Sequence, residues 1–258
     1  MNLSHSEIEI CVEQLIEEYD LDSIPINLEL LSEKTEVSLV EYSDADSGIC
    51  GALVCNNNEF SILYSTKLNN VGRHRFSIAH EFGHYFLPGH PEAVLKDGNR
   101  HESKSNSSDP FEKEADYFAT CLLMPRKSFI QSIETLPYNI DSISKISNMY
   151  MTSLTSTALR YVHLSSEAVS VIISKDGKIL YSKHSEPMKL LGNFWKSFKG
   201  QPIPTASLSS SIEMMDKPLS NIGSLNDWVT CDLPTECREE VLDLGSYGKR
   251  LSFIVALN

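Results

Sequence analysis

Apolar positions at helical spacing open the chain. From Ile8 to Tyr19 they recur every three or four residues behind two serines, which predicts an amphipathic helix that ends near Asp20. Pro25 interrupts this pattern, and a short helical turn is expected at residues 28–31. The first element is therefore predicted to be a helix with one buried face.

Between residues 37 and 64 the pattern changes to short apolar stretches separated by turn-forming residues. Strands are expected at residues 37–42, 49–55 and 60–64, with clusters of Asp, Ser, Gly and Asn between them. These stretches predict a small antiparallel sheet.

Helical spacing returns at residues 70–86, where a Pro-Gly pair ends the segment. The polar, serine-rich stretch between Gly89 and Asp109 predicts a mobile loop. Asp109 and Pro110 then stand in the order of a helix N-cap and a first helical residue, which predicts a helix that ends before Pro125.

Three further short helices are predicted, and they complete a first domain at residues 1–165 whose C-terminal helical segment spans about residues 126–165. They are expected at residues 128–135, 141–150 and 153–163.

After residue 165 the chain changes to strand-like stretches around turn residues. A hairpin is expected across residues 168–182, and a second strand pair at residues 240–244 and 250–257. The sequence therefore predicts a smaller α+β domain at residues 166–258 and an α+β fold for the whole chain.

The composition excludes several classes of protein. The 258 residues are 41% hydrophobic with a net charge of -13, and no apolar run approaches the length of a membrane span. The acidic N-terminus does not resemble a secretory signal, and the six cysteines form no CxxC pair. We therefore expect a cytoplasmic protein with reduced thiols and no membrane partner.

The acidic charge is concentrated in the predicted first domain. Residues 1–165 hold 12 basic and 24 acidic side chains, whereas the remaining residues hold 10 and 11. A negative field repels phosphate backbones, so the sequence argues against general affinity for nucleic acids.

The predicted helix at residues 70–86 contains the sequence His-Glu-Phe-Gly-His at residues 80–84. One helical turn places His80 and His84 on the same face, about 6 Å apart along the axis, so both imidazoles can bind one metal ion. Glu81 lies about 100° further around the helix, where its carboxylate can reach a metal-bound water. Two ordinary histidines on a half-buried face would give the same spacing, but the apolar flanks favour a metal site.

A third metal ligand is expected from the predicted helix that follows Asp109. Glu112 and Asp116 are four residues apart and share one face, so Glu112 could bind the metal while Asp116 accepts the second ring N–H of a ligand histidine. Glu114 points about 200° away from Glu112 and is the weaker candidate. A solvated acidic face would explain the same residues, but their pairing with the motif at residues 80–84 favours a ligand role.

The runs RFSIAHEFGHYFL and EKEADYFATCLLMP resemble the ImmA/IrrE family of zinc metallopeptidases. The family pattern is HExGH followed by E-x-x-A-[N/D]-x-F-A-x-x-L-L-M-P, and the resemblance covers about residues 25–165. It implies a zincin-like peptidase domain with Zn²⁺ as its cofactor. It also implies His80, His84 and Glu112 as zinc ligands and Glu81 as general base. Asp116 would be the residue that hydrogen-bonds a ligand histidine without binding the metal.

The resemblance also implies a biological role. Such proteins typically cleave a helix-turn-helix transcriptional repressor, often encoded nearby, and so derepress stress, mobile-element or phage-defence genes. Some carry a C-terminal GAF-like sensor domain, and residues 166–258 are compatible with one. A small molecule or single-stranded DNA is therefore a candidate signal at that domain.

The reaction requires further groups that the sequence does not rank. A peptide substrate is expected to add as a strand to an edge of the small sheet, near residues 49–55 or 60–64. An oxyanion formed during hydrolysis needs a hydrogen-bond donor. The candidates are His90, His101, Tyr64, Tyr85 and Tyr117.

Cys50 and Cys55 permit a sharper hypothesis. A thiolate on a strand beside the metal could occupy the open coordination position and inhibit the enzyme. Half-buried strand cysteines without a special role are the simpler interpretation.

Two competing functions remain at this point. The chain could be a regulatory binding protein with a structural or vestigial zinc site that acts through protein or DNA contacts. It could also bind DNA through the helices after Arg126, although four basic residues between Arg126 and His163 are few for that role.

Overall fold

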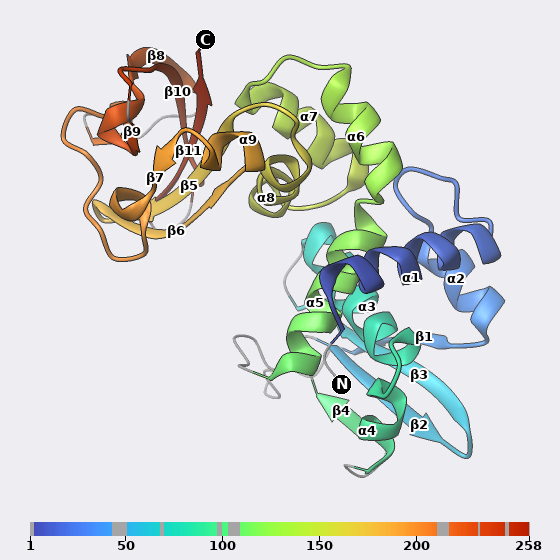
Figure 1. Ribbon diagram of the computed structural model, residues 1–258. Helices are drawn as coiled ribbons and strands as arrows, with labels where there is room; N and C mark the ends of the chain where they lie inside the picture. The colour runs from blue at the N-terminus through green and yellow to red at the C-terminus, as the bar shows by residue number, and fades with distance from the viewer. Residues whose placement is uncertain are drawn as a thin grey trace. The chain divides into compact units, whose positions relative to one another are not determined.

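The computed structural model describes residues 3–42, 51–67, 70–96, 100–102, 109–210, 217–231, 233–245 and 248–257. It divides into two compact units, which are described separately (Figure 1). The N-terminal unit comprises Met1–Ser128 and Ser147–Ser153, and the C-terminal unit comprises Phe129–Ile146 and Leu154–Asn258. None of the described helices combines the length and the apolar character that a bilayer crossing requires.

The N-terminal unit gathers its helices around one sheet. Its elements are α1 (His5–Glu18), α2 (Leu28–Thr35), β1 (Ser38–Tyr42), β2 (Gly51–Asn56), β3 (Glu59–Ser65), α3 (Val71–Phe86), α4 (His90–Lys96), β4 (Arg100–Glu102) and α5 (Pro110–Leu123).

The sheet of this unit has the order β1-β3-β2-β4. β2 pairs antiparallel with β3 and with β4, as expected, but β1 runs parallel to β3. β1 lies beside β3 rather than beside β2, the strand that follows it in the sequence. The sheet is therefore mixed, whereas the sequence predicted an antiparallel one.

The predicted substrate-binding edge is occupied. β3 is paired on both sides, and residues 52–54 of β2 pair with β4. The expectation that a peptide adds to β2 or β3 as a free edge is therefore wrong for these paired stretches. The cause is β4, together with α4, in a stretch where the sequence predicted only a loop.

The core of the N-terminal unit lies between the helices and the sheet. Ile8 of α1, Phe82 of α3 and Phe118 of α5 are fully buried in one apolar cluster that also contains Leu53 and Ile62 of the sheet. α3 packs against α5, β2 and β3, and Figure 1 shows α1, α3 and α5 gathered on one side of the sheet. This packing fixes α3 between the sheet and α5.

The C-terminal unit contains a five-stranded antiparallel sheet with the order β6-β5-β11-β10-β8. The elements from residue 126 onward are α6 (Arg126–Glu134), α7 (Ile140–Tyr150), α8 (Leu154–Leu164), β5 (Val169–Lys175), β6 (Lys178–His184), α9 (Glu186–Lys189), β7 (Gly192–Asn193), β8 (Leu219–Ser224), β9 (Thr230–Cys231), β10 (Glu236–Asp243) and β11 (Lys249–Ala256). Both faces of β5, which lies inside the sheet, are covered, since it is buried at six consecutive positions.

The compact units do not follow the predicted boundary at residue 165. α8 belongs to the C-terminal unit, where Tyr161 packs edge-on against Phe253 of β11 with ring centroids 5.7 Å apart. The backbone N–H of Ile140 donates to Glu240 of β10 at 2.8 Å. Periodicity predicts where helices and strands lie, but it does not show which core a helix joins. The α+β class is confirmed, and the boundary at residue 165 stays a prediction.

Candidate metal centre

α3 carries both predicted ligand histidines on its buried face. The side chain of Asn70 accepts from the backbone N–H of Arg73 at 3.0 Å and so caps the start of this helix. Residues 77–84 are all buried, with His80 5% and His84 1% exposed. The two rings lie with centroids 4.9 Å apart, one helical turn from each other.

α5 brings Glu112 to these histidines. Asp109 caps the helix and Pro110 occupies its first turn, so Glu112 lies where the N-terminus of the helix favours a carboxylate. The two helices approach closely at Gly83, where an added Cβ would lie 3.0 Å from the Cα of Ala115. The small residues of the two motifs therefore set the distance between the helices that supply the site.

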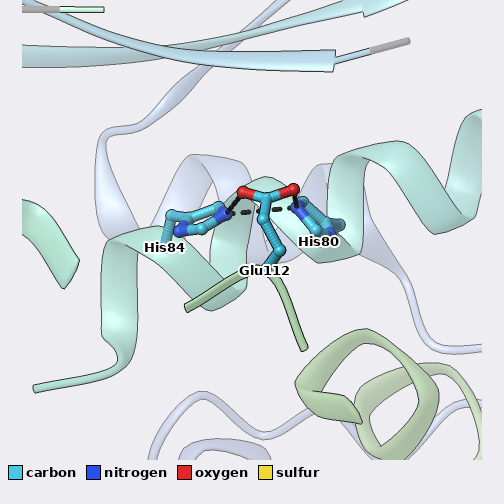
Figure 2. A group of neighbouring side chains, drawn as sticks. All are labelled: His80, His84 and Glu112. Carbon is cyan, nitrogen blue, oxygen red and sulfur yellow. Dashed lines mark hydrogen bonds and ion pairs between the residues drawn. The ribbon is translucent and has the colours of Figure 1, made fainter. Parts of the chain in front are cut away.

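The Glu112 carboxylate lies against both imidazoles (Figure 2). Its Oε1 is 3.2 Å from His84 Nε2, its Oε2 is 3.7 Å from His80 Nε2, and the two Nε2 atoms are 3.1 Å apart. Atoms bound at about 2.1 Å to one tetrahedral ion are separated from one another by about 3.4 Å. The three residues therefore have the spacing and the chemistry of a metal ligand set.

Hydrogen bonds on the far side of each ring point the lone pairs toward this set. His80 Nδ1 is 2.9 Å from Asp116 Oδ1, and His84 Nδ1 is 3.1 Å from His90 Nδ1. A ring that donates from Nδ1 presents an unprotonated Nε2. Two such nitrogens and a carboxylate at these distances repel one another unless a cation or a proton lies between them, so the donor set fits a metal.

The environment of the site shifts the pKa values of His80 and His90 in opposite directions. Burial lowers the pKa of His80, but its hydrogen bond to Asp116 and the carboxylates of Glu81, Asp116 and Glu112 outweigh burial and raise that pKa overall. Burial lowers the pKa of His90, and the opposing effect of Glu114 is smaller. The ligand set is therefore an acidic environment that stabilises positive charge.

Glu81 is fully buried on the side of α3 that faces the sheet. A Cβ added to Gly51 at the start of β2 would lie 2.8 Å from Glu81 Oε1. The backbone of β2 thus passes close to the predicted general base, and only a residue without a side chain leaves that space. Nothing in the sequence pattern pointed to Gly51.

The remaining predicted site residues lie as follows. Cys55 is buried on β2 but does not belong to the group of convergent ligand atoms, and Cys50 lies outside the described residues. Tyr117 stacks on His5 and donates to Glu9, so its hydroxyl is engaged away from the ligands. The side chain of His101 lies outside the described residues.

Two other candidate oxyanion donors are half-buried tyrosines. Tyr64 pairs with Gly51 across the β2–β3 ladder, so its side chain leaves the sheet on the face of Gly51 that approaches Glu81. Tyr85 packs edge-on against Phe60 with centroids 5.2 Å apart. Tyr64 is the better placed of the two.

His90 and Glu114 differ most from expectation. His90 was expected in a mobile loop, but it lies at the start of α4, is fully buried and has its Nε2 3.1 Å from Glu114 Oε2. Glu114, the weaker ligand candidate, is 8% exposed and is linked to His84 of the ligand set through His90. The Pro-Gly pair after α3 was the available signal, since such a turn redirects the chain toward the helix it has left.

Comparisons with known proteins bear on the fold and on the family of the chain. A solved structure of a Mycobacterium tuberculosis transcriptional regulator superposes with a TM-score of 0.63 at 15% identity, over 97% of this chain and 76% of that one. At this identity the likeness concerns the fold alone. No curated protein matches the sequence significantly.

The family model of the M78 peptidases, described as the IrrE N-terminal-like domain, matches residues 31–171. This range is more than half of the chain, and it contains α3, α5 and the ligand set. The resemblance seen in the two sequence motifs is confirmed. The chain belongs to the M78 peptidase family with an IrrE N-terminal-like domain.

Proposed function

We propose that the protein is a zinc-dependent endopeptidase. The observation that carries this proposal is the convergence of His80, His84 and Glu112 within 4.8 Å of one another, beside the fully buried Glu81. Two imidazoles and one carboxylate are a ligand set of catalytic zinc sites, which keep one position open for water or substrate. A zinc ion held there would act as a Lewis acid on the scissile carbonyl and on water.

In the proposed reaction each of these residues has a separate role. Glu81 takes the proton of the attacking water and passes it to the leaving amine. Asp116 and His90 hold the rings of His80 and His84 by their Nδ1 atoms. Tyr64 is our candidate for the group that donates to the oxyanion, because it lies across from Gly51 on the face of Glu81.

We further propose that the substrate is a helix-turn-helix transcriptional repressor encoded nearby, whose cleavage derepresses stress, mobile-element or phage-defence genes. Membership of the M78 family supports a regulatory peptidase, and the repressor is our extension of it. The C-terminal unit would receive the signal. Its sheet carries a cavity of about 360 Å³ lined by Ser174, Asp243 and Arg250 among others, which suits a small polar molecule better than single-stranded DNA.

The metal can be tested directly. We expect about one zinc per chain in protein purified without chelators, measured by elemental mass spectrometry, and loss of most of it in Glu112→Ala. Glu92→Ala, at an exposed position of α4, is the matched control and should retain zinc. A folded wild-type protein without zinc would contradict the proposal.

Hydrolysis is tested at Glu81. Glu81→Gln should keep zinc but reduce cleavage of the neighbouring repressor by at least about 100-fold, because it removes the general base. Cleavage is read by gel electrophoresis after mixing the purified proteins. If Glu81→Gln derepresses the target genes in cells as well as the wild type does, the protein acts as a binding module rather than as a peptidase.

A further inference from the structure

A buried chain of hydrogen bonds extends from His84 away from the ligand set. His84 Nδ1 lies 3.1 Å from His90 Nδ1, and His90 Nε2 lies 3.1 Å from Glu114 Oε2. Glu114 Oε1 in turn accepts the backbone N–H of Leu3 at 3.0 Å. Four segments of the N-terminal unit, namely α3, α4, α5 and the residues before α1, meet in this chain.

Burial makes this chain of hydrogen bonds important for stability. His84 and His90 are 1% and 0% exposed, and Glu114 is 8% exposed. A buried carboxylate or imidazole that loses its partner pays the full cost of its desolvation. The groups of the chain therefore depend on one another.

Glu114, the acceptor in these hydrogen bonds, determines which ring nitrogen of His90 and of His84 carries the proton. Glu114 Oε1 accepts the backbone N–H of Leu3, and with Oε2 also acting as an acceptor, His90 donates from Nε2 and presents the lone pair of Nδ1. His84 must then donate from Nδ1 to His90, which leaves the lone pair on His84 Nε2, the atom that faces Glu112. Glu114 thus determines, through His90, which nitrogen of His84 can bind a metal.

Local structure explains how His90 reaches this position. The backbone N–H of His90 donates to the carbonyl of Leu87 at 3.1 Å, which closes a turn over Pro88 and Gly89. Gly89 has a φ of 86°, and proline followed by glycine at positive φ is the pattern of a type II turn. The turn reverses the chain at the end of α3 and places His90 behind His84.

We propose that His90 and Glu114 are positioning residues that fix the tautomer and the orientation of the metal-binding imidazole of His84. This inference rests on the proposed metal site. Asp116 has the corresponding position behind His80, but it is exposed, whereas the His90–Glu114 pair is buried. One ligand histidine is therefore oriented from the surface and the other from the core.

The test measures zinc affinity by competition with a chromophoric chelator. Glu114→Gln and His90→Leu should each weaken zinc binding by about 10-fold to 100-fold, the usual effect of removing the partner of a ligand histidine. The double variant should bind no more weakly than the poorer single variant, because both act through one chain. Glu92→Gln makes the same chemical change as Glu114→Gln at an exposed site and should leave affinity unchanged.

A second measurement separates positioning from a general role in folding. The ¹⁵N chemical shifts of the His84 ring in metal-free protein should show the proton on Nδ1 in the wild type and a mixture or the other tautomer in Glu114→Gln. His90→Asn, whose side-chain oxygen can accept from His84 Nδ1, should restore part of the affinity lost in His90→Leu.

Zinc affinity within about twofold of the wild type in both Glu114→Gln and His90→Leu would overturn the inference. So would a wild-type His84 that carries its proton on Nε2. A wild type that binds no zinc contradicts the proposed function instead, and the tautomer of His84 in that protein still decides the role of Glu114.

Discussion

At the scale of single residues, two glycines allow the close contacts that place the candidate ligands and Glu81. Gly83 lets α3 approach Ala115 of α5, and Gly51 lets β2 pass the carboxylate of Glu81. Both glycines lie where a methyl group would meet a functional element. At Gly83 the methyl group would meet the backbone of α5, so the two helices would have to move apart, whereas at Gly51 it would meet only the side chain of Glu81.

Gly51→Ala should reduce peptidase activity while zinc content stays unchanged. The added Cβ would lie 2.8 Å from Glu81 Oε1, so the carboxylate has to move, and a shift of about 1 Å in a reacting group costs up to about 100-fold in rate. The measurement is kcat on the repressor together with zinc content. Gly223→Ala, on a strand where an added Cβ meets no atom within 4 Å, is the control, and equal losses in both variants would refute the prediction.

His184 makes the stability of the C-terminal unit depend on pH. Burial, aided by the charge of Lys189, lowers the pKa of His184 to about 4, while its Nδ1 contacts the hydroxyl of Ser170 at 2.8 Å. The unfolded chain, with a histidine pKa of about 6.5, binds this proton more readily. The stabilisation by neutral His184 is therefore complete above pH of about 6.5 and is lost as pH falls toward about 4.

We accordingly expect His184→Gln to weaken the fall in stability between pH 7 and about pH 4.5. The comparison is the difference in urea midpoint between the two pH values, in the variant and in the wild type. If that difference is the same in both proteins, His184 does not contribute to the acid sensitivity.

At the scale of elements, the start of α5 links helix stability to the metal centre. Asp109 accepts the backbone N–H of Phe111 at 3.0 Å, and Glu112 lies in the first turn that this cap holds. Helix ends fray first, so the position of Glu112 in the first turn of α5 depends on the Asp109 cap.

Asp109→Ala should lower the free energy of unfolding by about 1 kcal/mol and also weaken zinc binding. Asn27→Ala is the matched control, because Asn27 caps α2 by accepting from Leu30 at 2.9 Å and belongs to no ligand-bearing helix. Chemical denaturation measures the first effect and chelator competition the second. Equal zinc affinities in the two variants would show that the first turn of α5 is held by other contacts.

At the scale of the whole molecule, the C-terminal sheet depends on helices that precede it in the chain. Tyr161 of α8 is fully buried against Phe253, and the carbonyl of Tyr138 accepts from Arg238 of β10. A fragment of residues 166–258 lacks these groups. It would expose one apolar face of its sheet to water.

We therefore expect a fragment of residues 126–258 to unfold cooperatively in urea, and a fragment of residues 166–258 to aggregate or remain unfolded. Circular dichroism and size-exclusion chromatography distinguish the outcomes. A stable, monomeric 166–258 fragment would support the boundary that the sequence predicted.

Local pattern predicted most of the secondary structure and the candidate ligand set. Most predicted helices and strands lie within a few residues of the observed ones, because periodicity, caps and proline act over a few neighbouring residues. The helical repeat alone predicts that His80 and His84 share one face, whereas Glu112 was predicted from its spacing to Asp116 and from the family resemblance.

Tertiary packing decided what lies around those residues. The parallel pairing of β1 with β3, the burial of His90 against Glu114 and the approach of Gly51 to Glu81 each join segments far apart in the sequence. No short-range pattern encodes such contacts, because they depend on which elements share a core. The sequence by itself determined which residues can bind a metal, and only the folded chain decided which residues hold them in place.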